Sequence, residues 1–186
     1  MKEKHIIQLT KTERAIVKFI AQKRVEYNVK NGIQNGTWGN HDQLFFETLS
    51  YGAEFAFCKR FNLYPNFSWV PGVIPADARI ESIVFDIKHT TFSWGDLLVM
   101  EKRKLGDSDI YVLVKGTLED GFWVVGWIDE VGLILPENIK TLPGTDRKNY
   151  QIAHDKLASE YSLFKAIDLI RLDALEKRLV VRAIKE

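Results

Sequence analysis

The chain of 186 residues suits one domain with a sizeable core, and its 46% hydrophobic and 27% charged residues are typical of a globular protein, so we predict a single domain over residues 1–186. With 26 basic and 25 acidic residues the net charge is +1, which excludes an overall basic field, so nucleic acid would have to be bound by a local patch. The single cysteine, Cys58, excludes a disulfide framework and a cysteine-rich zinc site. Because the sequence has no long apolar run, we expect neither a signal peptide nor a membrane span, and we predict a cytoplasmic protein.

The N-terminal residues predict a short strand followed by a helix. Residues 5–9 are rich in β-formers. Thr10 and Glu13 have the spacing of a capping box, in which each side chain accepts a backbone N–H of the other, so we predict a helix over residues 11–28. The residues expected on its apolar face are Ile16, Phe19, Ile20 and Val25. The basic residues, which we expect on a solvated face, are Lys18, Lys23 and Arg24.

A second helix is predicted over residues 41–61, after a Gly- and Asn-rich loop. It is apolar almost all round, which is typical of a helix buried against a sheet. Gly52 costs about 1 kcal/mol relative to Ala in a helix, so it predicts a close approach of the backbone to a neighbour. Glu54 is the exception among aromatic residues, because a buried carboxylate is costly unless it is paired, hydrogen-bonded or metal-bound. Two interpretations stay open: a metal ligand, or a side chain that reaches solvent or a basic neighbour.

Four β-rich segments follow, at residues 82–89, 96–100, 109–115 and 122–128, with turn signals at 106–107 and 120–121. Because the linkers are short, we expect antiparallel neighbours in a mixed, largely antiparallel sheet flanked by helices, which is an α/β fold. Residues 133–150 are polar and predicted to be irregular. The chain ends in a predicted helix, from about residue 160, that either packs on the domain or forms a homodimer contact. Its apolar residues recur at helical spacing: Leu163, Ile167, Ile170, Leu175 and Leu179.

The stretch from residue 77 to residue 88 carries a candidate metal site. Asp86 and Lys88 are two residues apart in a predicted strand, so their side chains point to the same face. Asp77, on the preceding arm of a bend, would return beside Asp86. Two close carboxylates repel each other unless a cation lies between them, and hard oxygen ligands favour Mg²⁺ or Mn²⁺ over zinc. We therefore predict a metal-dependent phosphodiesterase site.

Each residue of this site has a predicted role. Asp77 and Asp86 would hold the metal, Lys88 would orient or help deprotonate the attacking water, and Glu54 would complete the metal's shell. An acid-x-Lys triplet alone is a weak signal. The chain contains a second one at residues 146–148 (Asp-Arg-Lys), in a polar loop, and we assign that triplet to the solvated surface.

The order of these residues resembles the PD-(D/E)XK nuclease superfamily. Pro75-Ala76-Asp77 corresponds to the first motif with one inserted Ala, Asp86-Ile87-Lys88 to the second, and Glu54 to the acidic residue of the preceding helix. The resemblance covers residues 52–128, and no Gln-x-x-x-Tyr element is present. It implies a restriction-endonuclease-like fold, a Mg²⁺- or Mn²⁺-dependent deoxyribonuclease and DNA as partner, with RNA left open. It also implies the backbone carbonyl of Ile87 as a metal ligand.

Other interpretations remain at this point. One is a non-catalytic nucleic-acid-binding or assembly protein on the same fold, and another is a structural domain with a buried Asp86–Lys88 ion pair. His89 is expected to pack or to be solvated rather than to act in catalysis. Trp94 is expected in the core, with stacking on a base as the alternative. The basic run at residues 102–104 either contacts a phosphate backbone or forms a charged turn.

Overall fold

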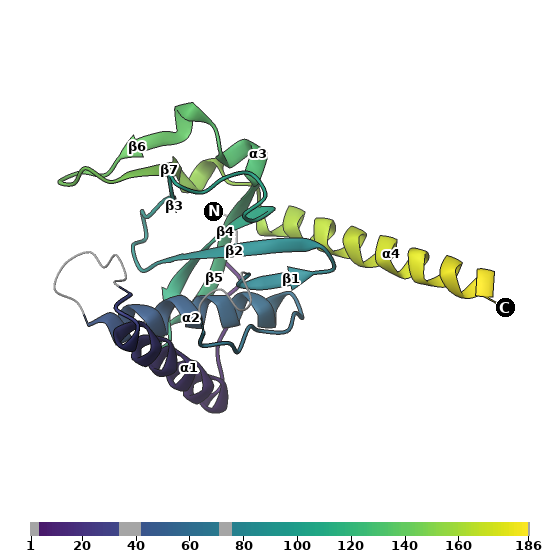
Figure 1. The fold of residues 1–186 in the computed structure, drawn as a ribbon, viewed down its shortest axis with the longest axis horizontal. Coiled ribbons are helices and arrows are strands. Elements are labelled where there is room, and N and C mark those ends of the chain that lie inside the picture. Colours follow the sequence, from purple (N-terminus) through teal and green to yellow (C-terminus); the bar gives the residue numbers. More distant parts are fainter. Residues whose placement is uncertain (1–3, 34–41, 71–75, 186) are drawn as a thin grey trace.

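Two helices open the chain in the computed structural model, which describes residues 4–33, 42–70 and 76–185: α2 covers one face of a central sheet, and α1 packs against α2 (Figure 1). α1 spans Lys11–Lys30 and α2 spans Gln43–Arg60. The predicted capping box is confirmed: Thr10 Oγ1 accepts the N–H of Glu13 at 3.2 Å, and Glu13 Oε2 accepts the N–H of Thr10 at 2.6 Å. Residue 41, which was predicted to begin the second helix, lies outside the described residues.

The buried face of α1 is the predicted one only in part, because Ile20 is buried and Ile16 packs against the core as expected. Phe19 is 54% exposed, so the prediction that it lies on the packed face is wrong. Arg24, predicted on a solvated face, is turned towards α2, where its guanidinium contacts Glu54. The residues of α1 that are buried lie three, four and eleven residues along from the first, which is one side of a helix: Val17, Ile20, Ala21 and Asn28. The packed stripe is therefore rotated towards Arg24.

Four strands form the central sheet, in the order β1-β2-β4-β5. They span Ala78–Ile80 (β1), Ile83–Thr90 (β2), Ile110–Thr117 (β4) and Gly121–Asp129 (β5). β1 and β2 are antiparallel, β2 and β4 are parallel, and β4 and β5 are antiparallel. We expected neighbouring strands of the sheet to be antiparallel, and that expectation is wrong for the neighbours β2 and β4. Residues 91–109, which join them, are long enough for the crossover that a parallel pair requires.

A second, three-stranded sheet lies across the opposite face of the central sheet from α1 and α2 (Figure 1). Its order is β3-β7-β6, with β3 at Leu97–Met100, β7 at Lys148–Ile152 and β6 at Ile139–Thr141. β3 is the predicted strand at 96–100, but its partner is β7 rather than a neighbour in sequence. β6 and β7 lie in or at the edge of the stretch predicted to be irregular, so that prediction is wrong. Short helical turns complete this part: α3 at Glu130–Leu133, η1 at Pro136–Asn138 and η2 at His154–Lys156.

Alternating side chains of the central sheet feed two hydrophobic clusters. On the α2 side, Phe85 of β2 packs on Phe57 of α2 with ring centroids 5.5 Å apart. On the other side, Tyr111 and Leu113 of β4 pack under the second sheet. The close approach predicted at Gly52 is confirmed, since a Cβ there would lie 2.8 Å from the ring of Phe122. The result is a mixed α/β fold with a mostly antiparallel sheet flanked by helices.

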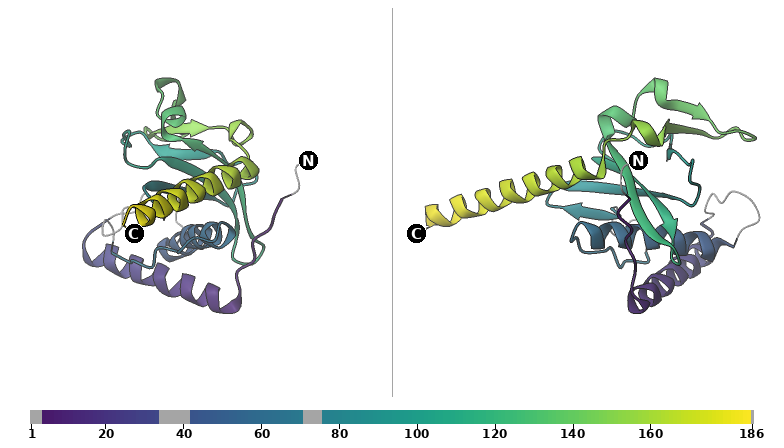
Figure 2. Two further views of the ribbon diagram at one scale, coloured as in Figure 1. Left: turned by 90° about the vertical axis from the view of Figure 1, so that its right-hand side faces the viewer. Right: turned by 180° about the vertical axis from the view of Figure 1, so that it is seen from behind.

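The predicted N-terminal strand does not form over its full length. Of residues 5–9, Ile7 alone pairs, in an isolated antiparallel bridge with Phe122. The last helix, α4, spans Glu160–Lys185 and extends away from the rest of the molecule (Figures 1 and 2). Among the helices of the described residues, none is long and apolar enough to cross a membrane.

Candidate functional site

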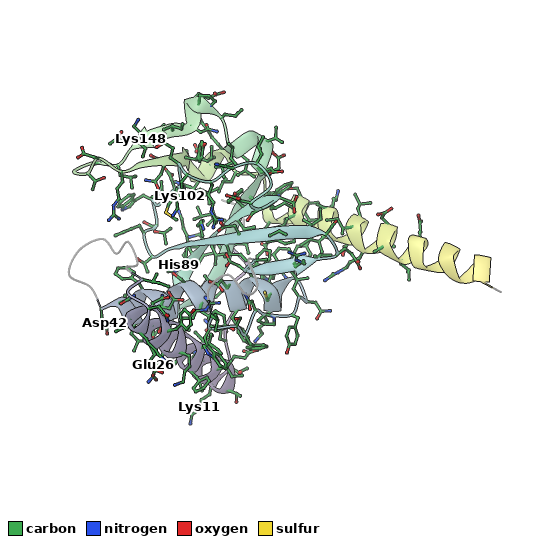
Figure 3. The ribbon with its side chains drawn as sticks, in the orientation of Figure 1. Lys11, Glu26, Asp42, His89, Lys102 and Lys148 are labelled. Carbon is green, nitrogen blue, oxygen red and sulfur yellow. The ribbon has the colours of Figure 1, made fainter. Side chains whose placement is uncertain are left out.

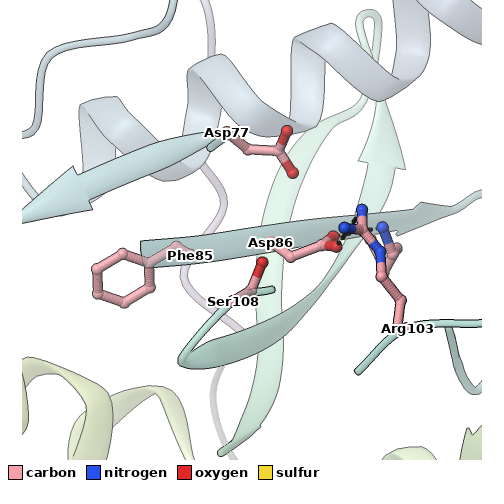
Figure 4. Close-up of a pocket in the computed structure, with 6 residues that line it drawn as sticks. Asp77, Phe85, Asp86, Arg103 and Ser108 are labelled. Carbon is pink, nitrogen blue, oxygen red and sulfur yellow. Dashed lines mark ion pairs between the residues drawn. The ribbon is translucent and has the colours of Figure 1, made fainter. Parts of the chain in front are cut away.

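The hairpin of β1 and β2 brings Asp77 beside Asp86 (Figure 4). The two strands are joined through Glu81, whose φ of 50° makes the tight turn. Asp77 immediately precedes the paired residues Ala78 and Phe85, and its backbone N–H donates to the carbonyl of Phe85 at 3.2 Å. The return predicted from sequence is therefore present, and it rests on the two-residue turn between Ile80 and Ile83.

Asp86 lies at the centre of an ion-pair cluster. Its carboxylate is 4% exposed and forms ion pairs with Lys88 and with Arg103, the latter at 3.2 Å between Arg103 Nη2 and Asp86 Oδ2. Arg103 also approaches Asp107, at 3.9 Å. Both Asp86 carboxylate oxygens are buried without a hydrogen bond of good geometry, so their compensation is the charge of the two cations.

Alternation along β2 puts Asp86 and Lys88 on one face, as predicted, while Phe85 and Ile87 face α2. That face lies against a small pocket of about 60 Å³, which has room for a few water molecules at about 10–15 Å³ each. The residues that line it are Asp77, Phe85, Asp86, Lys88, Arg103 and Ser108.

Electrostatics ties the two aspartates together. Burial and the nearby charge of Asp86 raise the pKa of Asp77 from 3.8 to about 6, against the opposing effect of Lys88. The hydrogen bond that Asp77 Oδ2 accepts from the Ile87 N–H, at 2.7 Å, favours the ionised form. Burial is the larger cause of this raised pKa, and a cation that entered between Asp77 and Asp86 would relieve the part that comes from their repulsion.

Glu54 is buried, and it is bound by a basic neighbour. Arg24 Nη1 and Nη2 donate to its two carboxylate oxygens at 3.1 and 3.2 Å, and Arg24 also reaches Glu47 at 3.4 Å. Burial and the charge of Asp77 raise the pKa of Glu54, while Arg24 opposes that rise. Glu54 does not line the pocket, so of the two interpretations left open for it, the basic neighbour describes its direct contacts.

The carboxylates of Asp77 and Asp86 are the kind of ligand that a hard divalent cation such as Mg²⁺ prefers. Within the described residues, no group of three or more His, Cys, Asp or Glu side chains is arranged to hold a metal ion. Mg²⁺, however, is commonly bound through one or two carboxylates, with water and substrate phosphate completing its shell. Asp77 and Asp86 supply two such carboxylates, and a cation that bound Asp86 would have to displace its ion pairs with Lys88 and Arg103. Lys88 and Arg103 are the side-chain cations at this position.

The contribution of Arg103 was missed from sequence. It belongs to the basic run at residues 102–104, but nothing local links that run to Asp86 on β2. The second triplet, at residues 146–148, is exposed as predicted, and Lys148 begins β7 in the second sheet (Figure 3).

Two further side chains of the β2–β3 region have clear positions. His89 packs, as expected, with its Nε2 at 2.8 Å from the carbonyl oxygen of Gly116 and its ring against Phe122. Trp94 is 70% exposed and stacks on Phe92 with ring centroids 4.8 Å apart, so the expectation that it lies in the core is wrong.

Known proteins add no further assignment. No sequence model of a protein family matches the chain, and neither a curated protein nor a solved structure matches it. The class that the fold defines is a mixed α/β protein with a mostly antiparallel sheet between helices and a second small sheet. The resemblance to PD-(D/E)XK nucleases rests on the residues quoted for it.

Proposed function

We propose that this chain is a metal-dependent nuclease of the PD-(D/E)XK type, on a restriction-endonuclease-like fold, that hydrolyses DNA phosphodiester bonds with Mg²⁺ or Mn²⁺. The observation that carries the proposal is the meeting of Asp77 and Asp86 in one pocket, with Lys88 on the same face. One or two carboxylates are the usual protein contribution to a Mg²⁺ site that also takes oxygens from a phosphate, and Asp86 of β2 and Asp77, just before β1, supply two.

In this proposal the residues of the pocket divide the work. Asp77, Asp86 and the carbonyl of Ile87 would hold the cation, which when bound supplies a Lewis acid for the phosphate and a more acidic water. Lys88 would leave Asp86 and orient the attacking water. Arg103, which is one-third exposed, would turn from Asp86 to the phosphate and add positive charge where negative charge develops.

A second candidate is a non-catalytic nucleic-acid-binding protein. It is supported by the exposed stack of Phe92 and Trp94 in the loop that follows β2, because exposed aromatic rings can stack on unpaired bases. In that case Lys88 and Arg103 would contact phosphate, and Asp86 would serve only to position them.

The test uses four proteins: wild type, Asp86→Ala, Lys88→Ala and Lys148→Ala. The last is a matched control, because Lys148 ends the other acid-x-Lys triplet and is exposed. Each is incubated with linear, circular, single-stranded and branched DNA in Mg²⁺ or Mn²⁺. We expect cleavage by wild type and Lys148→Ala, and a loss of at least about 100-fold in the two site variants. Absence of cleavage of every substrate, or equal cleavage by all four proteins, would overturn the catalytic assignment.

A further inference from the structure

The turn that joins β2 to β3 carries two exposed aromatic side chains. Phe92 is 57% exposed and Trp94 is 70% exposed, and their rings stack with centroids 4.8 Å apart and an angle of 23° between the ring planes. We call residues 91–95 the aromatic turn, and it lies at the opposite end of the molecule from the far end of α4 (Figures 1 and 2). Two neighbouring rings that a fold could have buried, but that it exposes together, indicate a contact surface.

Hydrogen bonds hold the aromatic turn in one conformation. Thr90 Oγ1 accepts the N–H of Phe92 at 3.2 Å, and the carbonyl of Phe92 accepts the N–H of Gly95 at 3.0 Å. The ammonium of Lys115, a residue that is 2% exposed, donates to the carbonyl of Ser93 at 2.8 Å. Because a buried lysine is costly unless it is hydrogen-bonded, this contact ties the turn firmly to β4. The two rings are therefore presented in a preorganised position.

The aromatic turn and the pocket lie on the same face of β2. Alternation puts Asp86, Lys88 and Thr90 in one row on that face. The turn packs on the end of the row, because a Cβ at Gly95 would meet the Thr90 side chain at 2.7 Å. Asp86 and Thr90 are about 13 Å apart along the strand, and the charged side chain between them is Lys88, a cation that is 29% exposed. A DNA strand that leaves the pocket along this row would pass a positive charge before it reaches the rings.

The chemistry of the aromatic turn matches an unpaired base. Phe92 covers one face of the Trp94 ring, and the exposed face can stack on a second flat ring. In a duplex each base is already stacked and paired, so taking it out costs free energy, whereas an unpaired base offers a free face. The turn is therefore suited to a single-stranded segment rather than to an intact duplex.

We propose that the aromatic turn binds an unpaired base, so that the substrate of the Asp77–Asp86 pocket is DNA with a single-stranded segment. The path of the strand into the pocket rests on the proposed function, whereas stacking on the turn can be measured without metal or cleavage. Single strands, frayed ends and branched junctions contain such a segment, and a blunt duplex does not.

Binding of fluorescently labelled DNA to wild type, Trp94→Ala and Phe92→Ala, measured by anisotropy in EDTA, tests the proposal. The probes are a single strand and a blunt duplex of the same sequence. We expect wild type to bind the single strand more tightly, and both variants to weaken that binding by at least about fivefold without a change for the duplex. Tyr161→Ala is the matched control, because Tyr161 is a 67% exposed aromatic residue on α4. Equal binding of the two probes by wild type, or of the single strand by wild type and Trp94→Ala, would overturn the proposal.

An abasic nucleotide separates stacking from contact with phosphate, because it removes a base and keeps its phosphate. We expect wild type to lose affinity when one particular position of the single strand is abasic. Trp94→Ala should be insensitive to the same lesion, because the ring on which the base stacks is already absent. An equal loss of affinity in both proteins would show that the base does not stack on Trp94 and would overturn the proposal.

Cleavage in Mn²⁺ distinguishes failure of this inference from failure of the proposed function. If wild type cleaves DNA and Trp94→Ala cleaves single-stranded DNA equally well, the nuclease proposal stands and the inference about the aromatic turn fails. If binding to single strands depends on Trp94 and neither protein cleaves them, the base-stacking surface stands and the nuclease proposal fails.

Discussion

Oδ2 of Asp77 accepts a 2.7 Å hydrogen bond from the backbone N–H of Ile87, the residue between Asp86 and Lys88. This contact holds the Asp77 carboxylate against β2 and leaves its other oxygen for the pocket. The same contact places the Asp77 carboxylate close to a second carboxylate, that of Asp86, and the two negative charges repel each other. The arrangement therefore has a testable electrostatic cost.

The pH dependence of stability should report that cost. The pKa of Asp77 is raised from 3.8 to about 6 on folding, chiefly by burial and then by Asp86, so between these values the folded state binds more protons than the unfolded state. The contribution of Asp77 to stability is thus present below pH 3.8 and is lost as the pH rises through about 6. Asp77→Asn keeps a group that can accept from Ile87 but cannot ionise. We expect the free energy of unfolding of this variant, measured in urea, to rise relative to that of wild type from pH 4 to pH 7. Parallel plots of that free energy against pH for the two proteins would refute the raised pKa of Asp77.

Removal of Arg24 should be costly, because it would leave the buried carboxylate of Glu54 unpaired. We expect Arg24→Ala to lower the free energy of unfolding by about 3–5 kcal/mol, with a smaller loss in the double variant Arg24→Ala, Glu54→Gln. Chemical denaturation at neutral pH measures both. Lys23→Ala is the neighbouring control, since the exposed Lys23–Glu26 pair should contribute less than about 1 kcal/mol. Equal effects of Lys23→Ala and Arg24→Ala would refute the role assigned to Arg24.

Arg103 and a bound cation would compete for Asp86. Arg103→Gln removes one of the two cations that compensate the buried Asp86 carboxylate, so it should lower the metal-free unfolding free energy by more than the roughly 1 kcal/mol of an exposed pair. The same change should tighten Mn²⁺ binding, measured by titration calorimetry, because Asp86 no longer has to release the guanidinium. Lys104→Gln, at an exposed neighbouring position, should change neither quantity. Weaker Mn²⁺ binding in Arg103→Gln would show that Arg103 does not compete with the cation.

The packing of α2 on β5 can be tested at Gly52. A methyl group there would meet the ring of Phe122 at 2.8 Å and the side chain of Leu118 at 3.3 Å. The gain in helix propensity from Gly52→Ala, about 1 kcal/mol, should therefore be exceeded by overpacking, with a net loss of stability in thermal unfolding. Ser50→Ala, on the same helix, serves as the control. A stabilised Gly52→Ala would mean that α2 lies farther from Phe122.

Local pattern predicted the parts of the site that are close in sequence. The shared face of Asp86 and Lys88 follows from strand alternation, and the return of Asp77 follows from a short bend. Glu54 could be recognised as anomalous from its apolar neighbours, but its partner Arg24 lies 30 residues earlier on another helix. An ion pair between two helices has no local signal, and neither does the approach of Arg103 to β2.

The fold shows the same division. The capping box at Thr10 fixed the start of α1 from four residues of sequence. The parallel pairing of β2 with β4 was not predictable from linker length, because β3 leaves the central sheet to pair with β7, about 50 residues later. Strand partners depend on tertiary packing, and short exposed strands such as β6 lack the alternating pattern that sequence reasoning uses.

The most direct measurement of the central claim is Mn²⁺ binding to wild type, Asp86→Asn and Asp146→Asn, followed by thermal unfolding and titration calorimetry. If Asp77 and Asp86 form a cation site, saturating Mn²⁺ should stabilise wild type and Asp146→Asn, by about 2.7 kcal/mol at 100 times Kd, and should leave Asp86→Asn unchanged. If Asp86 is only the partner of Lys88 and Arg103, Asp86→Asn will lose stability without any metal, and Mn²⁺ will stabilise none of the three proteins. That second result would contradict the metal site and the nuclease proposal built on it.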